Sequence, residues 1–264
     1  MQIIDHLLTG DDTNQVESPN RSGKFKTGLP DAIIIHYTAG ADAASSIRSL
    51  CNPQSKASAH VVVARDGKIT QLVPFDTVAW HAGKSSYGGR DGYNNYSIGI
   101  EIDNAGLLTK TGDSYQSWFG RGYLAEQVIA AVHRNEKTVR YWHTYTEAQI
   151  AAVEELCALL MGEYSIKQIL GHEEISPGRK VDPGPAFPLD KLRDKLLNLG
   201  RNEDGPAEEA LPEKGTVTAD SLNIRIGPSA SAAMAALPLK KNAVVSIHQE
   251  CYLLWRWYIP MQQV

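Results

Sequence analysis

Two histidines and one aspartate have the residue types of a metal-ligand set. His36 directly follows the apolar run Ile33-Ile34-Ile35, and His172 follows Gln168-Ile169-Leu170-Gly171, so we expect each at the carboxyl end of a strand. Asp182 follows in a proline-containing loop. Two imidazoles and one carboxylate that leave a fourth position to water are a frequent catalytic zinc set. Because the histidines lie far apart in the sequence, spacing alone leaves open that they are structural.

Two further charged residues have types that would complete such chemistry. The alternation across Ser97–Ile102 predicts a strand whose isoleucines share one face and whose Glu101 lies on the other. Lys180 stands two residues before Asp182, and in an extended loop this spacing directs both side chains the same way. A carboxylate can move a proton from water to a leaving nitrogen, and a cation stabilises a developing oxyanion. A partnered structural carboxylate and a surface ion pair remain the alternatives for these two residues.

Short apolar runs predict the strands that position these residues. Residues 32–35 fit a strand buried on both faces. Residues 60–64 and 69–73, separated by Arg65-Asp66-Gly67-Lys68, predict a hairpin. Together with the expected strands before His172 and around Glu101, they indicate one sheet.

Three segments have helical spacing. Tyr123–His133 carries apolar residues four apart and is expected to be a helix. Thr146-Glu147-Ala148-Gln149 fits a capping box that opens a second helix, with Cys157 in its apolar stripe as a core thiol. Leucines at positions 189 to 199 predict a third, closed by Gly200. The fold class is therefore α/β, a mixed central sheet flanked by helices.

Composition excludes several classes of protein. The 264 residues are 42% hydrophobic and 21% charged, as in globular domains. The net charge of −4 disfavours general nucleic-acid binding, and no apolar run is long enough to span a membrane. Three scattered cysteines do not make a disulfide framework or a thiolate zinc site. The first residues do not have the pattern of a secretory signal, which leaves an export route unknown.

Residues 200–215 predict an acidic flexible linker. The segment GRNEDGPAEEALPEKG holds glycines, prolines and acidic residues with little to bury. It divides the chain into a domain at 1–199 and a smaller one at 216–264. The short apolar runs of the smaller part, broken by Gly227-Pro228-Ser229 and Lys240-Lys241-Asn242, are typical of a small all-β barrel.

The larger part resembles the zinc-dependent N-acetylmuramoyl-L-alanine amidases of the type 2 family, which are related to peptidoglycan recognition proteins and phage lysozyme-amidases. The matching pieces occur in family order between about residues 30 and 198: Ile34-Ile35-His36-Tyr37-Thr38, Ser58-Ala59-His60, Asp66-Gly67, Trp80-His81-Ala82-Gly83, Ser97–Ile102, Gly171-His172 and Gly178–Gly184.

This resemblance implies a role for each candidate residue. It implies one zinc ion per chain on His36, His172 and Asp182, with Glu101 as catalytic acid/base and Lys180 as stabiliser of the transition state. Substrate contacts are expected at His81 and Tyr37, with a structural role as the alternative for His81.

The smaller part resembles bacterial SH3-like modules. The matching residues are Val217-Thr218-Ala219, Leu222-Asn223-Ile224-Arg225 and Gly227-Pro228-Ser229. The glycine-tryptophan pairs usual near the end of such modules are not clearly present, and Leu254-Trp255-Arg256-Trp257 stands there instead. We therefore expect the barrel fold more than ligand binding.

The resulting prediction is a zinc hydrolase of peptidoglycan or muropeptides, cutting the amide between N-acetylmuramic acid and L-alanine and acting on the cell wall in the periplasm or outside the cell. A non-catalytic peptidoglycan-binding protein, or an amidase restricted to soluble muropeptides, is the alternative. Residues 104–145 are rich in aromatics and are expected either to pack as an extra helix or to form a wall of the substrate groove. The sequence does not distinguish a recycling enzyme, a phage lysin or an antibacterial effector, and leaves stem-peptide preference and oligomeric state open.

Overall fold

A computed structural model describes residues 1–112, 114–197, 214–216, 221–222, 239–242 and 244–246. The chain divides into two compact units, Met1–Arg201 and Asn202–Val264. Within the described residues, no helix combines the length and apolar character that a membrane span requires.

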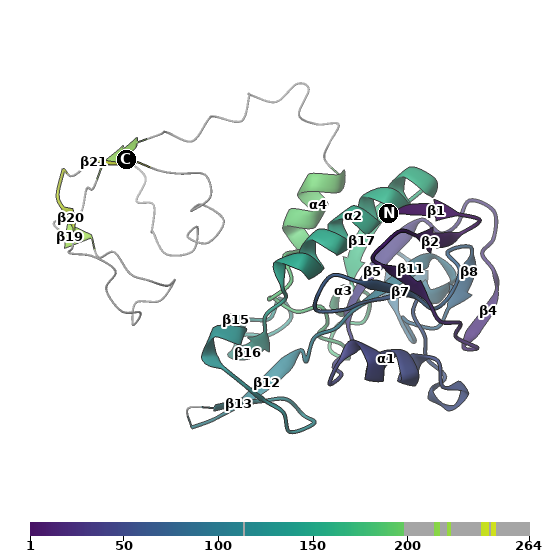
Figure 1. Cartoon of the computed structure of the whole chain (residues 1–264), viewed down its shortest axis with the longest axis horizontal. Helices are drawn as coiled ribbons and strands as arrows, with labels where there is room; N and C mark the ends of the chain where they lie inside the picture. The colour runs from purple at the N-terminus through teal and green to yellow at the C-terminus, as the bar shows by residue number, and fades with distance from the viewer. Residues whose placement is uncertain (113, 198–213, 217–220, 223–238, 243, 247–264) are drawn as a thin grey trace. The chain divides into compact units, whose positions relative to one another are not determined.

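A six-stranded mixed sheet forms the centre of the first unit (Figure 1). In sheet order its strands are β17 (Gln168–Gly171), β5 (Ala32–Tyr37), β11 (Ser97–Ile102), β6 (Val61–Val63), β7 (Ile69–Gln71) and β3 (Thr13–Gln15). The first four run parallel, β7 returns antiparallel to β6, and β3 is parallel to β7. The strands expected at 32–35 and 97–102 and the hairpin after residue 60 are confirmed.

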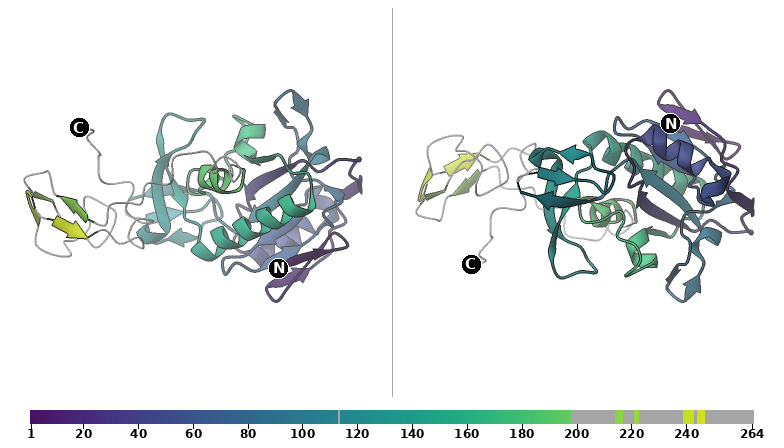
Figure 2. Two further views of the ribbon diagram at one scale, coloured as in Figure 1. Left: turned by 90° about the horizontal axis from the view of Figure 1, so that it is seen from above. Right: turned by 90° about the horizontal axis from the view of Figure 1, so that it is seen from below.

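Helices cover both faces of this sheet (Figures 1 and 2). Helices α2 (Glu147–Glu163) and α4 (Leu189–Leu197) pack on one face through Leu156, Cys157, Leu192 and their neighbours. Helix α1 (Ala43–Leu50) packs on the other face, against Val62. The capping box at Thr146 and the buried thiol of Cys157 are confirmed. The predicted closure of α4 at Gly200 lies outside the described residues.

A curled antiparallel sheet occupies the segment between β11 and α2. In sheet order its strands are β14 (Gly122–Tyr123), β13 (Ser114–Gln116), β12 (Leu107–Thr111), β16 (Val139–His143) and β15 (Val128–Val132). The helix expected over 123–133 is wrong. Spacing of four fitted a helix, but residues 128–132 pair with 139–143 in the sheet and place Ile129 opposite Trp142, which is buried. The extra helix considered for 104–145 is therefore replaced by strands.

The other elements of the first unit are short. They are β1 (Gln2–Ile4), β2 (Leu7–Thr9), β4 (Arg21–Lys24), β8 (Thr77–Ala79), β9 (Ser86–Tyr87), β10 (Arg90–Asp91), α3 (His172–Ile175) and the 3-10 turns η1 (Pro53–Ser55), η2 (Tyr93–Asn95) and η3 (Ala125–Gln127). Strand β1 pairs with β2, β4 with β8 and β9 with β10, all antiparallel.

The described residues of the second unit form two antiparallel strand pairs. Strand β18 (Lys214–Thr216) pairs with β21 (Val244–Ser246), and β19 (Ser221–Leu222) pairs with β20 (Leu239–Lys240). The predicted linker, residues 200–215, overlaps β18 at its last two residues, Lys214 and Gly215. Most of the residues that carry the SH3-like resemblance lie outside the described part of the chain, so that fold stays a prediction.

Candidate active site

His36 and Glu101 lie side by side on one face of the central sheet. They are register partners on the parallel strands β5 and β11. The alternation of each strand sends Ile35 and Ile100 into the core under α2, so that His36 and Glu101 project from the opposite face. The sequence pattern that placed Glu101 opposite the isoleucines is thereby confirmed, and parallel pairing explains why two residues far apart in the chain meet.

Three potential metal ligands converge beside them. The Nδ1 atoms of His36 and His172 lie 2.9 Å apart, and Asp182 Oδ2 lies 3.0 Å from the first and 2.9 Å from the second. All three side chains are buried. His172 reaches this point because β17 is parallel to β5 with Gly171 opposite Ile35, so the next residue extends past the same end of the sheet. The structure brings together the two histidines and the aspartate that the sequence singled out.

The outer nitrogens of the two imidazoles face acceptors that fix their protonation. His81 Nε2 lies 3.1 Å from the carbonyl oxygen of Ser97 and must donate to it, which leaves His81 Nδ1 as an acceptor 3.0 Å from His36 Nε2. His36 therefore carries its proton on Nε2. His172 Nε2 lies 3.2 Å from the carbonyl oxygen of Ala82 and donates to it in the same way. Both histidines thus turn an unprotonated Nδ1 toward Asp182.

This arrangement fits a metal ion. Three acceptor atoms 2.9 to 3.0 Å apart repel one another unless a cation or a proton lies among them. Burial, and then the neighbouring His172, lowers the pKa of His36 to about 4, which keeps its imidazole neutral as a ligand must be. Burial opposes the charge on Asp182, but hydrogen bonds from the two imidazoles hold the pKa of Asp182 below its ordinary value when a proton lies between them. Two imidazoles, one carboxylate and hydrogen-bonded outer nitrogens are a donor set that suits zinc.

Gly99 provides the room that His81 occupies. A Cβ on Gly99 would lie 2.4 Å from the His81 ring, well inside van der Waals contact. On the far side, His60 accepts from the Gly99 N–H at Nδ1 and donates from Nε2 to the carbonyl oxygen of Thr77. His36 is therefore backed by the buried imidazole rings of His81 and His60, and Gly99 leaves the space that the His81 ring fills.

Glu101 combines burial with an unsatisfied oxygen. It lines a pocket of about 330 Å³, and its Oε2 atom is buried without a hydrogen-bond partner among the residues that the structure describes. Burial, and then the charge of Asp182, raises the pKa of Glu101 to about 8. A carboxyl group with a pKa near neutrality both accepts and releases protons readily, as a general acid/base requires. An unsatisfied buried oxygen beside the three ligands is suited to hold a reacting water.

Lys180 brings a positive charge to the same place. Its charge lowers the pKa of both His36 and Glu101. In the described parts of the chain its ammonium group forms no ion pair with a carboxylate. The described residues therefore do not show the surface ion pair that was the alternative role for Lys180.

Contacts within the protein are sufficient to explain the positions of the Tyr37 and His81 side chains. Tyr37 follows His36 on β5 and points to the opposite face, where its ring covers Gly106 at a distance that leaves no room for a Cβ. Burial raises the pKa of the Tyr37 hydroxyl. His81 is buried behind His36. The substrate contacts expected of these two residues stay predictions.

The loop that carries Asp182 is held by a residue that the sequence reasoning missed. The N–H of Glu173 donates to the carbonyl oxygen of Asp182 at 2.9 Å, and its carboxylate accepts from the N–H of Gly184 at 3.1 Å. The same carboxylate lies 2.6 Å from His133 Nε2 and 2.9 Å from Arg134 Nε. An acidic residue directly after a candidate ligand was the signal in the sequence, since its partners His133 and Arg134 come from the distant connection between β15 and β16.

Comparison with known proteins agrees with this site. The family model described as N-acetylmuramoyl-L-alanine amidase (Amidase_2) matches residues 26–185. The 1,6-anhydro-N-acetylmuramyl-L-alanine amidase AmpD of Escherichia coli is 37% identical over 138 residues, which are 52% of this chain and 57% of that protein. The N-acetylmuramoyl-L-alanine amidase AmiD of Escherichia coli is 34% identical over 169 residues, 61% of this chain and 51% of that protein. The chain thus spans little more than half the length of these relatives.

Solved structures show the same fold. A crystal structure of a selenomethionine AmpD derivative superposes with a TM-score of 0.51 at 26% identity, covering 74% of this chain and 99% of that one. AmiD from Escherichia coli in complex with anhydro-N-acetylmuramic acid-L-Ala-D-gamma-Glu-L-Lys gives a TM-score of 0.50 at 31% identity, covering 64% and 59%. The family match covers more than half of the chain and contains all three converging ligands. The chain therefore belongs to the Amidase_2 family of N-acetylmuramoyl-L-alanine amidases.

Proposed function

We propose that this chain hydrolyses the amide bond between N-acetylmuramic acid and the L-alanine of a peptidoglycan stem peptide, with one zinc ion bound by His36, His172 and Asp182. The observation that carries the proposal is the position of Glu101, whose unsatisfied buried oxygen projects from the strand beside His36. A site that only bound peptidoglycan would not need a carboxyl group held ready to exchange a proton. The names of the relatives AmpD and AmiD support this reaction class.

Each residue of the site has a separate role in the proposed reaction. Zinc, when bound, acidifies a water molecule and polarises the amide carbonyl. Glu101 takes the proton of the attacking water and delivers it to the nitrogen of L-alanine as that nitrogen leaves. Lys180, whose charge already acts on Glu101, stabilises the negative charge that develops on the carbonyl oxygen. His81 and the carbonyl of Ala82 keep the two histidines in the tautomer that presents Nδ1.

The substrate and the place of action belong to the same proposal. AmiD was solved with an anhydromuramyl peptide, and we infer that a muropeptide or the corresponding part of polymeric peptidoglycan occupies the pocket at Glu101 here. Action on the wall, in the periplasm or outside the cell, follows if the substrate is polymeric. We further propose that the second unit is an SH3-like module that holds the wall. Comparing sacculus binding by the full chain and by residues 1–201 tests this role.

Digestion of defined peptidoglycan tests the reaction itself. Mass spectrometry of the products should show free stem peptides that begin with L-alanine, together with glycan whose lactyl carboxyl groups are free. Products with new reducing sugar ends, or with cuts inside the stem peptide, would contradict the proposal. Parallel digestion of a soluble anhydromuramyl tetrapeptide separates a general amidase from one restricted to small muropeptides.

A further inference from the structure

A tight turn at the tip of the curled sheet reaches the rim of the Glu101 pocket. Residues 117–121 join β13 to β14. The turn is closed by the N–H of Ser117, which donates to the carbonyl oxygen of Arg121 at 2.9 Å, and by the N–H of Gly120, which donates to the carbonyl oxygen of Ser117 at 3.0 Å. Gly120 has a φ of +85°, a left-handed conformation that favours glycine. The turn therefore presents Trp118 and Phe119 on a defined backbone.

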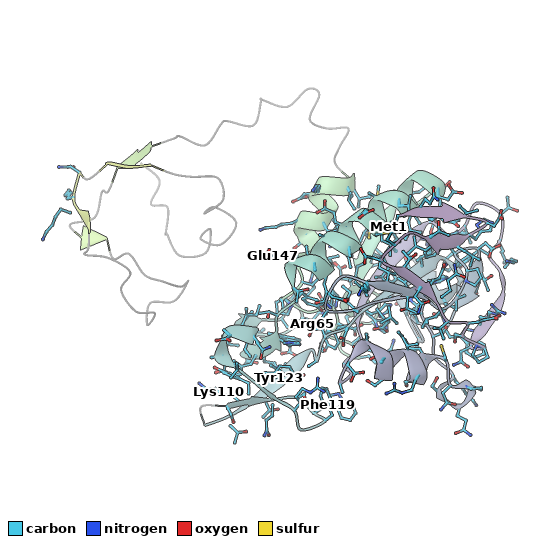
Figure 3. The ribbon with its side chains drawn as sticks, in the orientation of Figure 1. Met1, Arg65, Lys110, Phe119, Tyr123 and Glu147 are labelled. Carbon is cyan, nitrogen blue, oxygen red and sulfur yellow. The ribbon has the colours of Figure 1, made fainter. Side chains whose placement is uncertain are left out.

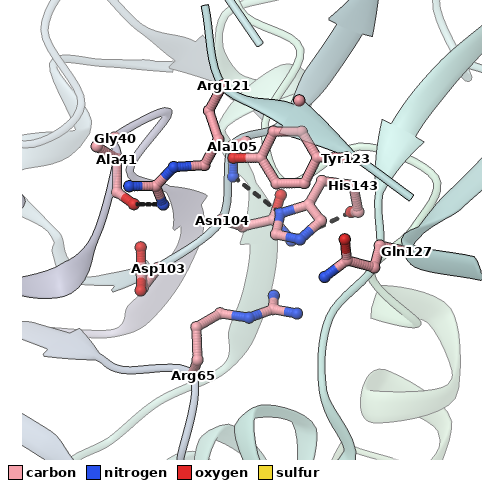
Figure 4. A pocket seen from close by; sticks show the side chains of 11 residues that line it. Gly40, Ala41, Arg65, Asp103, Asn104, Ala105, Arg121, Tyr123, Gln127 and His143 are labelled. Atoms are coloured by element: carbon pink, nitrogen blue, oxygen red, sulfur yellow. Dashed lines mark hydrogen bonds between the residues drawn. The ribbon is translucent and has the colours of Figure 1, made fainter. Parts of the chain in front are cut away.

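Two side chains tie this turn to the segment that follows β5. The indole N–H of Trp118 donates to the carbonyl oxygen of Ala39 at 2.7 Å. Arg121 donates to the carbonyl oxygen of Ala41, as the close-up of the neighbouring, smaller pocket shows (Figure 4). This segment begins two residues after Tyr37 at the end of β5, so the turn is held close to the strand that carries His36. The aromatic residues are thereby positioned over the site and not free on a loose loop.

Trp118 is exposed although its only donor is satisfied. Its side chain is 78% exposed, the highest value among the large hydrophobic residues that the structure describes. Trp118 and Phe119 line the same pocket as Glu101 and Ser49 of α1. Phe119 lies at the end of the hairpin toward α1 (Figure 3). With its N–H already used, Trp118 offers the solvent an apolar ring and nothing else.

We propose that Trp118 and Phe119 form a subsite for a pyranose ring of the glycan, in the pocket that they share with Glu101 and Ser49. This inference rests on the proposed amidase function and names residues that recognise the sugar part of the substrate. A pyranose has apolar C–H faces and a rim of hydroxyl groups. An exposed indole covers one such face, and the hydroxyl group of Ser49 can exchange hydrogen bonds with the rim, whereas those of Ser45 and Ser46 already donate to the carbonyl oxygen of Asp42. The pocket of about 330 Å³ lies within the range of small-molecule sites, roughly 300–1,000 Å³.

The charges around the pocket favour a sugar over the stem peptide at this position. Among the residues that the structure describes, its lining includes neither lysine nor arginine, and the nearest guanidinium group, that of Arg121, lies 5.8 Å from the centroid of the Phe119 ring. The adjacent pocket of about 230 Å³ contains Arg65 and Arg121. Arg65 donates to the carbonyl oxygen of Thr144, and Arg121 donates to the carbonyl oxygen of Ala41, the bond that Figure 4 shows. A neutral ligand with hydroxyl groups therefore matches the pocket beside Trp118.

Binding of a peptide-free glycan fragment tests the subsite without any chemistry. The probe is a neutral tetrasaccharide of N-acetylglucosamine, titrated into the full chain by calorimetry and followed by ligand-observed NMR. Trp118→Ala should weaken its binding about tenfold, as expected for loss of one anchoring tryptophan. Trp118→Phe keeps a ring but loses the bond to Ala39, and should retain most of the affinity. Val139→Ala, which removes an exposed apolar side chain elsewhere on the curled sheet, is the matched control and should bind like the wild type.

The outcomes separate this inference from the proposed function. With peptidoglycan as substrate, Trp118→Ala should raise KM and leave kcat unchanged, because the lost contact is made equally before and during the reaction. If the wild type fails to bind the tetrasaccharide, or if Trp118→Ala binds it as the wild type does, the subsite is wrong even where hydrolysis is normal. If Trp118→Ala instead weakens binding of a free stem peptide, the turn recognises peptide and the inference is overturned. Tetrasaccharide binding lost with Trp118, in a protein that shows no hydrolysis, would support the subsite and contradict the amidase.

Discussion

The Nε2 atom of His36 lies 3.0 Å from the Nδ1 atom of His81, on the side of the His36 ring away from Asp182. This contact fixes which nitrogen of His36 faces the other two ligands, because His81 is itself committed as a donor to the carbonyl oxygen of Ser97. His81 thus acts on the metal site through another residue. The first prediction follows from this chain of contacts.

Replacing His81 should weaken metal binding without removing a ligand. His81→Phe fills the same space but cannot accept the His36 proton, so His36 loses the partner that orients its Nδ1. We expect zinc affinity to fall by about 10- to 100-fold, the usual effect of losing such an outer partner. Competition with a chromophoric chelator measures it. Ser97→Ala leaves the backbone carbonyl in place and serves as control, and equal zinc affinities in wild type and His81→Phe would refute the positioning role.

Replacing Glu101 should separate chemistry from metal binding. Glu101→Gln keeps the size of the side chain and removes the group that transfers the proton, so turnover should fall about 100-fold or more. Zinc content should stay at the wild-type value, whereas Asp182→Ala should lose the metal. Steady-state kinetics and metal analysis on the two variants check this. Near-normal turnover of Glu101→Gln would show that another group is the base.

Lys180 should contribute to turnover and not to metal retention. Lys180→Ala removes a cation that acts on the reacting groups, and loss of one such stabilising interaction costs on the order of 3 kcal/mol in the transition state. The expected result is a fall in kcat with an unchanged zinc affinity. Lys180→Arg keeps the charge in a different shape and is the matched comparison. A kcat of Lys180→Ala equal to that of the wild type would show that Lys180 does not contribute to turnover.

The free energy of unfolding should decrease as the pH is lowered, because the buried His60 stays unprotonated in the folded chain. Burial lowers the pKa of His60 to about 4, below its ordinary value of 6.5, so the unfolded chain binds a proton that the folded chain excludes. The free energy of unfolding that His60 controls is fully present above pH 6.5 and declines as the pH falls toward 4. The loss over this window is about 3 kcal/mol. Urea unfolding across the pH range should show a shallower decline for His60→Gln, and parallel curves for the two proteins would contradict the assignment.

Local signals singled out the two histidines and Glu101, and the family resemblance then assigned the zinc ligands. His36 and His172 each follow an apolar strand, and Glu101 stands on the polar side of an alternating strand. Parallel pairing of β5 and β11 brings the first histidine beside Glu101, a register that only the structure shows. The capping box at Thr146 was equally local.

The features that the sequence did not predict depend on distant partners. Residues 123–133 carry apolar side chains at helical spacing, yet pairing of 128–132 with 139–143 gives them a sheet in which Trp142 is buried. The role of His81 depends on His36 and on the space above Gly99, which no local pattern reveals. A glycine in the middle of the polar face of β11 was the one available hint, since it marks a place where another group approaches closely.

Titration of zinc into chelator-treated protein tests the central claim most directly. The two imidazoles and the carboxylate form one site, so hydrolysis of an anhydromuramyl peptide should be absent after chelation, rise linearly with added zinc and level off at one ion per chain. The same titration on Asp182→Ala should give neither stoichiometric binding nor recovery. Full hydrolytic activity in protein without stoichiometric metal would contradict the account.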